Sequence, residues 1–179
     1  MAENETKVDL SIIVVNWNVK ELLRECLTSI QEHDGDITLE AIVVDSASSD
    51  GSPKMVEEEF PWVKLIASKQ NLGYPRGNNL GILASNGRYV LILNPDTVIL
   101  KDALEVMVKY LDDHIDVGVV GPQLLNADGT IQSSRRRFPS LLTGLFESTW
   151  FEPLAPRGLI RQYYAQDLPD DQENDVDWV

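Results

Sequence analysis

Four short apolar runs recur along the first half of the chain, and each has the length of a buried β-strand. Small or polar residues end each run, and segments whose apolar positions have helical spacing separate one run from the next. Strands that alternate with helices predict right-handed crossover connections and a parallel sheet. The predicted strands are 10–15, 39–44, 63–67 and 89–93.

The predicted helices follow these strands. Apolar positions 22, 23, 26, 27 and 30 repeat with a helical period, and Asn18 with Glu21 three residues later resembles a capping box at the helix start. Proline is favoured in the first turn of a helix, so Pro53 is expected to open the second one. The remaining helices are predicted at 78–85, after a glycine-containing loop at 73–77, and around 104–111.

The pattern changes beyond residue 116. Val117–Val120 is predicted to be another short strand, and 124–131 a β-hairpin that turns at Asp128-Gly129. Residues 141–154 carry large apolar groups without a clean period, which fits either a helix packed on the sheet or a mobile flap. Residues 167–177 contain six acidic residues and no basic one, which predicts a loop or tail.

Composition narrows the class of protein. With 179 residues, 43% of them hydrophobic, the chain is expected to form one main globular α/β domain. The formal net charge of −14 disfavours binding to nucleic acid. Neither a membrane span nor a signal peptide is predicted, which favours a cytoplasmic location. The single cysteine, Cys26, lies among leucines and is expected in the core, and no Cys/His cluster suggests zinc.

Polar residues follow each predicted strand, and in a parallel sheet these positions share the carboxyl edge, where α/β proteins bind ligands. Asn16 and Trp17 follow the first strand, where an amide can bond to a base while the indole stacks on it or only covers the core. Asp45 ends the second strand, and it can accept hydrogen bonds from a ribose or base, or only from loop amides. Asp50 is expected to be structural, as part of a helix start.

Asp96 follows the fourth strand in the turn Asn94-Pro95-Asp96. A carboxylate there can hold a divalent cation against phosphate oxygens, although an Asp after a strand also serves as an ordinary turn residue. Arg76, near a predicted helix start, can bind a diphosphate together with the helix amides, or can be a surface residue without a ligand. The cluster Arg135–Arg137 either binds a phosphate-bearing ligand or forms a solvated face.

Three common signatures do not occur. The first strand is not followed by GxGxxG, and the chain contains neither GxxxxGK[ST] nor a nucleophile elbow around a serine. These absences argue against dinucleotide oxidoreductases, P-loop enzymes and α/β-hydrolases.

The four polar loops make the chain similar to the GT-A glycosyltransferases of family 2, and within them to the bacterial rhamnosyltransferase-like group. The similarity covers roughly residues 9–140, and its combined motifs are quite specific. The matching segments are SIIVVNWN at 11–18, VVDS with SDGS within 43–52, NLGY with RGNNLG within 71–81, and LNPD at 93–96.

The resemblance implies a Rossmann-like GT-A fold, with a mostly parallel sheet flanked by helices, a C-terminal hairpin and an acidic tail. It implies an N-terminal extension at 1–8, a nucleotide-sugar-binding core at 9–140 and the truncated start of an acceptor region at 141–179. The implied donor site consists of Asn16, Trp17, Asn18, Asp45, Arg76 and Asn94 for the nucleotide, with Asp96 holding Mg²⁺ or Mn²⁺.

Two departures from the family pattern matter. Asn94 stands where the first Asp of the DxD motif would be, so metal binding would rest on Asp96. The family's catalytic base lies beyond a stretch similar to Asp177-Trp178-Val179, where this sequence ends. The base is therefore expected to be absent from this chain, and neither Asp175 nor Asp177 is assigned that role.

The predicted activity is inverting hexosyl transfer, with rhamnose as the sugar suggested by the resemblance. The expected partners are a dTDP- or UDP-sugar donor and a glycan or lipid-linked acceptor, in the cytoplasm or peripherally at the inner membrane face. The alternative is a nucleotide-sugar-binding fragment without turnover, because the base lies beyond residue 179. A sugar nucleotidyltransferase would need a glycine-rich triphosphate loop near the N-terminus, which Asn16–Asn18 does not supply.

Overall fold

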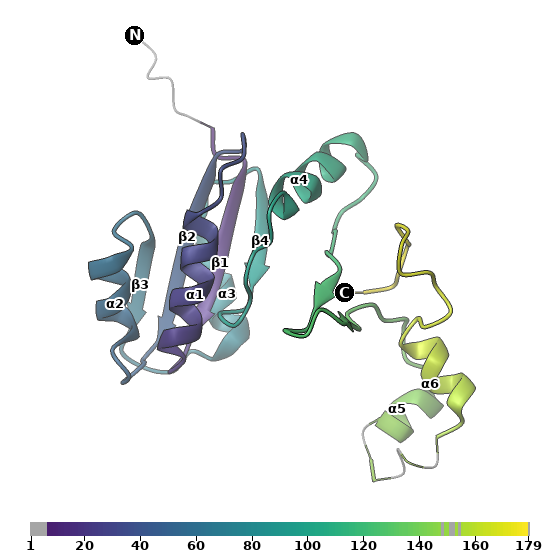
Figure 1. Cartoon of the computed structure of the whole chain (residues 1–179). Helices are drawn as coiled ribbons and strands as arrows, with labels where there is room; N and C mark the ends of the chain where they lie inside the picture. The colour runs from purple at the N-terminus through teal and green to yellow at the C-terminus, as the bar shows by residue number, and fades with distance from the viewer. Residues whose placement is uncertain (1–6, 148, 151–152, 154, 179) are drawn as a thin grey trace. The chain divides into compact units, whose positions relative to one another are not determined.

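The structure is a computed structural model that describes residues 7–147, 149–150, 153 and 155–178. The chain divides into two compact units, of which the first ends at Asp116 and the second begins at Val117. The first unit is coloured purple to teal in Figure 1, and the second green to yellow. The predicted boundary at residue 140 concerns the family's donor-binding part, and it stays a prediction.

The first unit contains a four-stranded parallel sheet in the order β3-β2-β1-β4. All four strands predicted from the apolar runs are present, and β3 is shifted by one residue relative to the prediction. The parallel order confirms the predicted α/β fold class. The strands are β1 (Leu10–Asn16), β2 (Leu39–Ser46), β3 (Lys64–Ser68) and β4 (Tyr89–Leu93).

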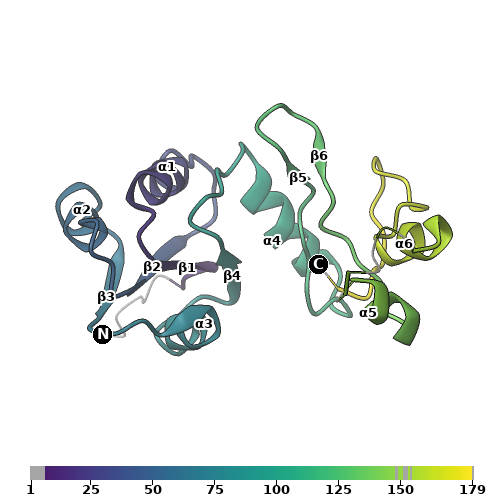
Figure 2. The ribbon, with the colours of Figure 1, turned by 90° about the horizontal axis from the view of Figure 1, so that it is seen from below.

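Helices cover both faces of this sheet. Figure 2 shows α1 and α2 on one face and α3 on the other. Alternate side chains of β1 and β2 point to opposite faces of the sheet. Ile12 and Val43 belong to the larger hydrophobic cluster, which includes residues of α1, whereas Val15 and Val44 belong to a smaller cluster with Leu72. The helices are α1 (Lys20–Gln31), α2 (Ser52–Glu59), α3 (Gly73–Leu83) and α4 (Ala103–Asp113).

Helix α3 lies directly on β1 because two of its residues have no side chain. A Cβ atom added at Gly77 would be 2.8 Å from Cγ1 of Val15, and one at Gly81 would be 2.4 Å from Cγ2 of Ile13. Both distances are too short for any larger residue without movement of the strand side chains. This close packing holds the N-terminal turn of α3 at the carboxyl edge of the sheet.

The predicted loop at 73–77 is wrong, because α3 begins at Gly73. Gly77 reads as a helix breaker in the sequence, but here it faces the strand it packs on. Pro75 lies in the first turn, where a missing N–H leaves no intrahelical hydrogen bond unmade.

The predicted capping box at the start of α1 is also wrong. The N-cap residue is Val19, and no side chain caps the helix from that position. Asn18 adopts a left-handed conformation with φ 55°, and its side-chain oxygen accepts hydrogen bonds from Ser49 instead. The side chain of Asn18 therefore bonds to Ser49, 31 residues away, instead of capping α1.

The second unit contains the predicted hairpin, with β5 (Leu124–Leu125) antiparallel to β6 (Ile131–Gln132). Its turn includes Gly129 at φ 82°, a conformation that favours glycine. The strand predicted at Val117–Val120 is wrong: this segment pairs with no strand in the described part of the chain, and the side chain of Val119 is 77% exposed. A run of four residues becomes a strand only when a neighbouring edge accepts its hydrogen bonds.

Two helices follow in the second unit, α5 (Leu141–Glu147) and α6 (Arg157–Tyr163). The first part of the apolar segment 141–154 is thus helical, while residues 148, 151, 152 and 154 lie outside the described residues. None of the helices among the described residues is long and apolar enough to cross a membrane.

The acidic segment 167–178 folds back on the arginine cluster of the same unit. Arg137 forms two 2.8 Å hydrogen bonds to Asp167, Arg135 pairs with Asp170, and the backbone of Arg136 bridges to Trp178. Two of the three guanidinium groups are therefore already paired with carboxylates. These pairs are solvent-accessible, so they contribute little to the stability of the unit.

Candidate functional site

The parallel register of the first unit brings the predicted site residues to one edge of the sheet. Asn16, at the end of β1, lies opposite Asp45 of β2, and Val14 lies opposite Leu93, the last residue of β4. Asn94 follows directly. The loops after the strands therefore meet at the lower end of the sheet in Figure 1.

Asn16, Asp45 and Ser48 form a hydrogen-bonded network beneath this edge. Asn16 Nδ2 donates to Asp45 Oδ1 at 2.7 Å and to Ser48 Oγ at 3.1 Å, and the backbone N–H of Ser48 donates to Asp45 Oδ2 at 2.9 Å. Asn16 and Asp45 are 0% and 1% exposed. Asn16 Oδ1 is buried and forms no hydrogen bond among the described residues. The fold thus brings the predicted residues Asn16 and Asp45 together and leaves Asn16 Oδ1 as an acceptor without a hydrogen bond among the described residues.

Trp17 and Asn18 lie above the network. Trp17 is 57% exposed, so its indole does not cover the core. Asn18 accepts a 2.7 Å hydrogen bond from the backbone N–H of Ser49, and its own backbone N–H donates to Ser48 Oγ. The loop after β1 is therefore tied to the loop after β2, and the ring of Trp17 remains available for stacking.

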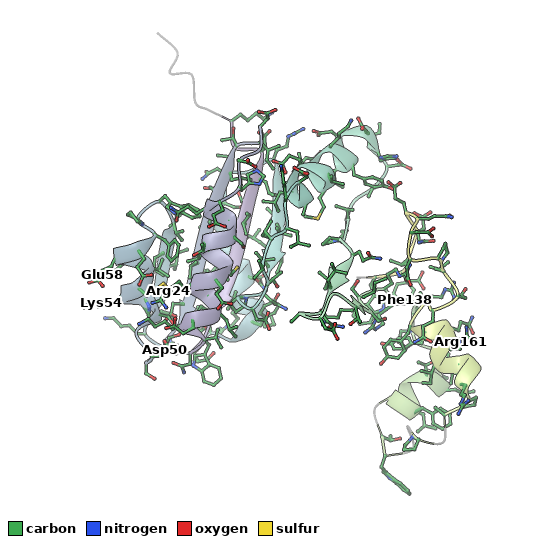
Figure 3. All side chains as sticks on the ribbon, viewed as in Figure 1. Arg24, Asp50, Lys54, Glu58, Phe138 and Arg161 are labelled. Atoms are coloured by element: carbon green, nitrogen blue, oxygen red, sulfur yellow. The ribbon has the colours of Figure 1, made fainter. Side chains whose placement is uncertain are left out.

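Asp50 forms hydrogen bonds with the first residues of both α1 and α2. Figure 3 shows Asp50 at the carboxyl edge of the sheet. Its carboxylate accepts hydrogen bonds from the backbone N–H of Lys20, the first residue of α1, and from the N–H and hydroxyl of Ser52, the first residue of α2. Desolvation raises the pKa of Asp50, but these hydrogen bonds outweigh it and hold the pKa below its ordinary value of 3.8. This geometry fits the structural role predicted for Asp50.

Replacing Asp50 with asparagine should lower the stability by about 0.5–2 kcal/mol near pH 7, because an amide cannot accept all of these hydrogen bonds. A carboxylate with a lowered pKa stabilises the fold above its unfolded-state pKa, and this contribution is lost as the pH falls through the folded-state value. The difference between wild type and Asp50→Asn should therefore shrink below about pH 4. Urea unfolding from pH 3 to 7 measures it.

The matched control is Asp36→Asn, which changes an exposed Asp in the loop before β2. We expect this variant to follow the wild-type stability at each pH. An Asp50→Asn variant as stable as wild type at pH 7 would contradict the capping role.

The turn after β4 is anchored by α1. The main-chain oxygen of Asn94 accepts the backbone N–H of Thr97 at 3.2 Å and lies 3.9 Å from Sγ of Cys26. Burial and the nearby charge of Asp96 raise the pKa of Cys26 to about 12, so the thiol stays protonated and can donate. The predicted core position of Cys26 is confirmed, and the thiol also holds the turn in place.

Asp96 is exposed, and its carboxylate forms no hydrogen bond or ion pair within the described residues. In the same part of the chain, no three His, Cys, Asp or Glu side chains group closely enough to hold a metal ion by themselves. A free carboxylate beyond a strand end fits a cation that takes its other ligands from phosphate oxygens and water, as Mg²⁺ commonly does.

Arg76 lies in the first turn of α3 and is exposed. Its guanidinium forms no hydrogen bond or ion pair within the described residues. The amides of Leu72 and Gly73 at this helix start already donate to side-chain oxygens of Ser46 and Asn71. An anion here would therefore be bound by the Arg76 side chain more than by the helix N-terminus.

Two residues of the edge were not singled out from the sequence. Ser48 lies in a loop of small residues, and only the fold shows that it connects Asn16, Asn18 and Asp45. Tyr74 lies within a matching motif, and its hydroxyl donates to Asn94 Oδ1 at 3.1 Å. No local pattern marks the contacts of Ser48 with Asn16 and Asn18 or of Tyr74 with Asn94, because these partners are 20 or more residues away.

The comparisons with known proteins cover the segment that contains the site residues. A family model described as glycosyl transferase family 2 matches residues 11–170. N-acetylglucosaminyl-diphospho-decaprenol L-rhamnosyltransferase of Mycobacterium tuberculosis is 26% identical over 181 aligned positions, and the match covers 95% of this chain and 58% of that protein. The chain thus spans just over half the length of this curated relative.

Solved structures also resemble the chain. Staphylococcus aureus TarS 1–349 in complex with UDP has a TM-score of 0.60 and 28% identity, covering 71% of this chain and 39% of that one. The mannosyltransferase PcManGT from Pyrobaculum calidifontis, in complex with GDP-Man and Mn²⁺, has a TM-score of 0.57 and 28% identity, covering 68% and 37%.

Proposed function

Since the chain belongs to glycosyl transferase family 2, we propose that it holds the nucleotide-diphosphate sugar of an inverting sugar transfer at the carboxyl edge of its sheet. One observation carries this proposal: hydrogen bonds at that edge connect the carboxyl ends of β1 and β2 with the segments that follow β3 and β4. Asn16 bonds to Asp45, Ser46 to the loop before α3, and Tyr74 to Asn94. Ligands of open α/β sheets bind at this position.

The nucleoside is assigned to the loops after β1 and β2. The exposed indole of Trp17 offers a stacking face for a base, and Asn18 lies beside it. Asn16 contributes an acceptor without a partner, and the carboxylate oxygens of Asp45 each have a further lone pair. Both residues are almost fully buried, so a base N–H or a ribose hydroxyl would complete these hydrogen bonds only when the loop after β1 shifts to admit it.

The diphosphate is assigned to Arg76, Asn94 and Asp96. Asp96 would hold Mg²⁺ or Mn²⁺, and the structure of PcManGT with GDP-Man and Mn²⁺ is a precedent for such a cation in a similar fold. When bound, the cation would neutralise charge on the departing diphosphate. Arg76 would add a charged hydrogen-bond donor on the same side, where negative charge develops as the sugar leaves.

The sugar, the acceptor and the transfer step belong to the whole protein. The rhamnosyltransferase relative is named for an L-rhamnosyl group and for an acceptor carried on decaprenol diphosphate. We therefore propose rhamnose as the sugar and a lipid-linked or glycan acceptor, with the protein in the cytoplasm or peripheral at the inner membrane face.

Calorimetric titration of the chain with UDP, dTDP and GDP tests the donor site, with Mg²⁺, with Mn²⁺ and with EDTA. We expect one of the uracil or thymine nucleotides to bind, and to bind more tightly when a divalent cation is present. Binding that is equal in EDTA would contradict the cation site at Asp96. Failure of all three nucleotides to bind under every condition would contradict the donor site itself.

A further inference from the structure

Asn94 is held from both faces of the sheet. Its side-chain oxygen Oδ1 accepts the hydroxyl of Tyr74 at 3.1 Å, and its main-chain oxygen lies 3.9 Å from Sγ of Cys26. Tyr74 is the second residue of α3, which Gly77 and Gly81 seat closely on β1. The amide group of Asn94 is therefore fixed in orientation by a side chain that belongs to a well-packed helix.

The identity of the bonded atom determines what Asn94 can offer a ligand. An asparagine side chain has one oxygen, which accepts hydrogen bonds or binds cations, and one NH₂ group, which only donates. The Tyr74 hydroxyl takes one of the two lone pairs of Oδ1 and turns this oxygen toward α3, whereas both N–H donors of the exposed Asn94 form no hydrogen bond among the described residues. Phosphate oxygens accept such donors, whereas a cation does not bind an NH₂ group.

We propose that Tyr74 is a positioning residue that turns Asn94 into a hydrogen-bond donor for the diphosphate and leaves the cation to Asp96. This inference rests on the proposed donor site and specifies it further. Asn94 then acts on the diphosphate whether or not a cation is present.

The test compares nucleotide dissociation constants of Tyr74→Phe and wild type, both in Mn²⁺ and in EDTA. We expect Tyr74→Phe to weaken binding of UDP or dTDP about threefold to tenfold, and by the same factor in both conditions, because the lost hydrogen bond orients a phosphate donor. The matched control is Tyr110→Phe. Its hydroxyl lies in the last turns of α4 and forms no hydrogen bond among the described residues.

A double-mutant cycle separates positioning from a general structural effect. In an Asn94→Ala background, Tyr74→Phe should have no further effect, because the group that it orients is gone. Asn94→Ala alone should weaken binding by at least as much as Tyr74→Phe, again equally in Mn²⁺ and in EDTA. The midpoint of thermal unfolding of each variant should lie within about 2–4 °C of wild type, since the pair is exposed.

Three results would overturn the inference. The first is a loss in Tyr74→Phe that appears only with Mn²⁺, which would make Asn94 a ligand of the cation. The second is a loss that persists in the Asn94→Ala background, and the third is unchanged affinity in Tyr74→Phe. In each case wild type still binds nucleotide, which distinguishes these results from failure of the donor site, where wild type binds none.

Discussion

Replacing Asp96 with alanine should remove the effect of Mg²⁺ or Mn²⁺ on nucleotide binding and weaken the affinity for the nucleoside diphosphate in Mn²⁺ about 100-fold. The reason is that Asp96, the proposed ligand of the cation, is charged, whereas Asn94 is neutral and its oxygen already accepts a hydrogen bond from Tyr74. A cation that bridges a carboxylate and a diphosphate contributes several kcal/mol, and each 1.4 kcal/mol is a factor of ten in affinity. Calorimetry in Mn²⁺ and in EDTA measures the difference.

The fold should be unaffected, because Asp96 is exposed and has no hydrogen-bond or ion-pair partner among the described residues. The matched control is Asp36→Ala, which removes the same charge from the loop before β2, at the opposite end of the sheet. If Asp96→Ala and Asp36→Ala bind nucleotide with the same affinity in Mn²⁺, the cation does not bind at the turn.

Replacing Asp45 with alanine should destabilise the protein by about 2–4 kcal/mol. The carboxylate accepts hydrogen bonds from Asn16 Nδ2 and from the backbone of Ser48, and it is 1% exposed. Its removal leaves two donors without their acceptor beneath the edge, where little water can replace it, and hydrogen bonds to a charged group contribute about 1.5–3 kcal/mol each. Urea unfolding followed by circular dichroism measures the loss.

Asp45→Asn sharpens this prediction. An asparagine has one side-chain oxygen, so it can accept from Asn16 or from Ser48 but not from both. We therefore expect a loss between those of wild type and Asp45→Ala, with Asp36→Ala again as the control at full stability. Equal stability of Asp45→Ala and wild type would show that the network contributes nothing. The proposed contact of Asp45 with the nucleoside is tested separately, by titrating Asp45→Asn with nucleotide at a temperature where it remains folded.

The errors of the sequence-based prediction have a common cause. Gly73–Gly77 was expected to be a loop, and it is helical because Gly77 packs on Val15. Asn18 was expected to cap its own helix, and it bonds to Ser49 instead. Val117–Val120 was expected to be a strand, and it finds no edge to pair with among the described residues. In each case, a contact with a distant segment, or its absence, decided against a local preference.

The amino-acid sequence by itself determined the alternation of strands and helices, the resemblance to family 2 glycosyltransferases that the family match confirms, and the edge at which the candidate site lies. These follow from local periodicity and from the rule that parallel strands share their carboxyl ends. Only the tertiary structure decided which atoms of the edge are free. Asn16 and Asp45 are 29 residues apart, and Tyr74 and Asn94 are 20 apart, yet each pair is hydrogen-bonded. Such pairs form because the register and the close packing of α3 place them together, and neither is visible in the periodicity of the chain.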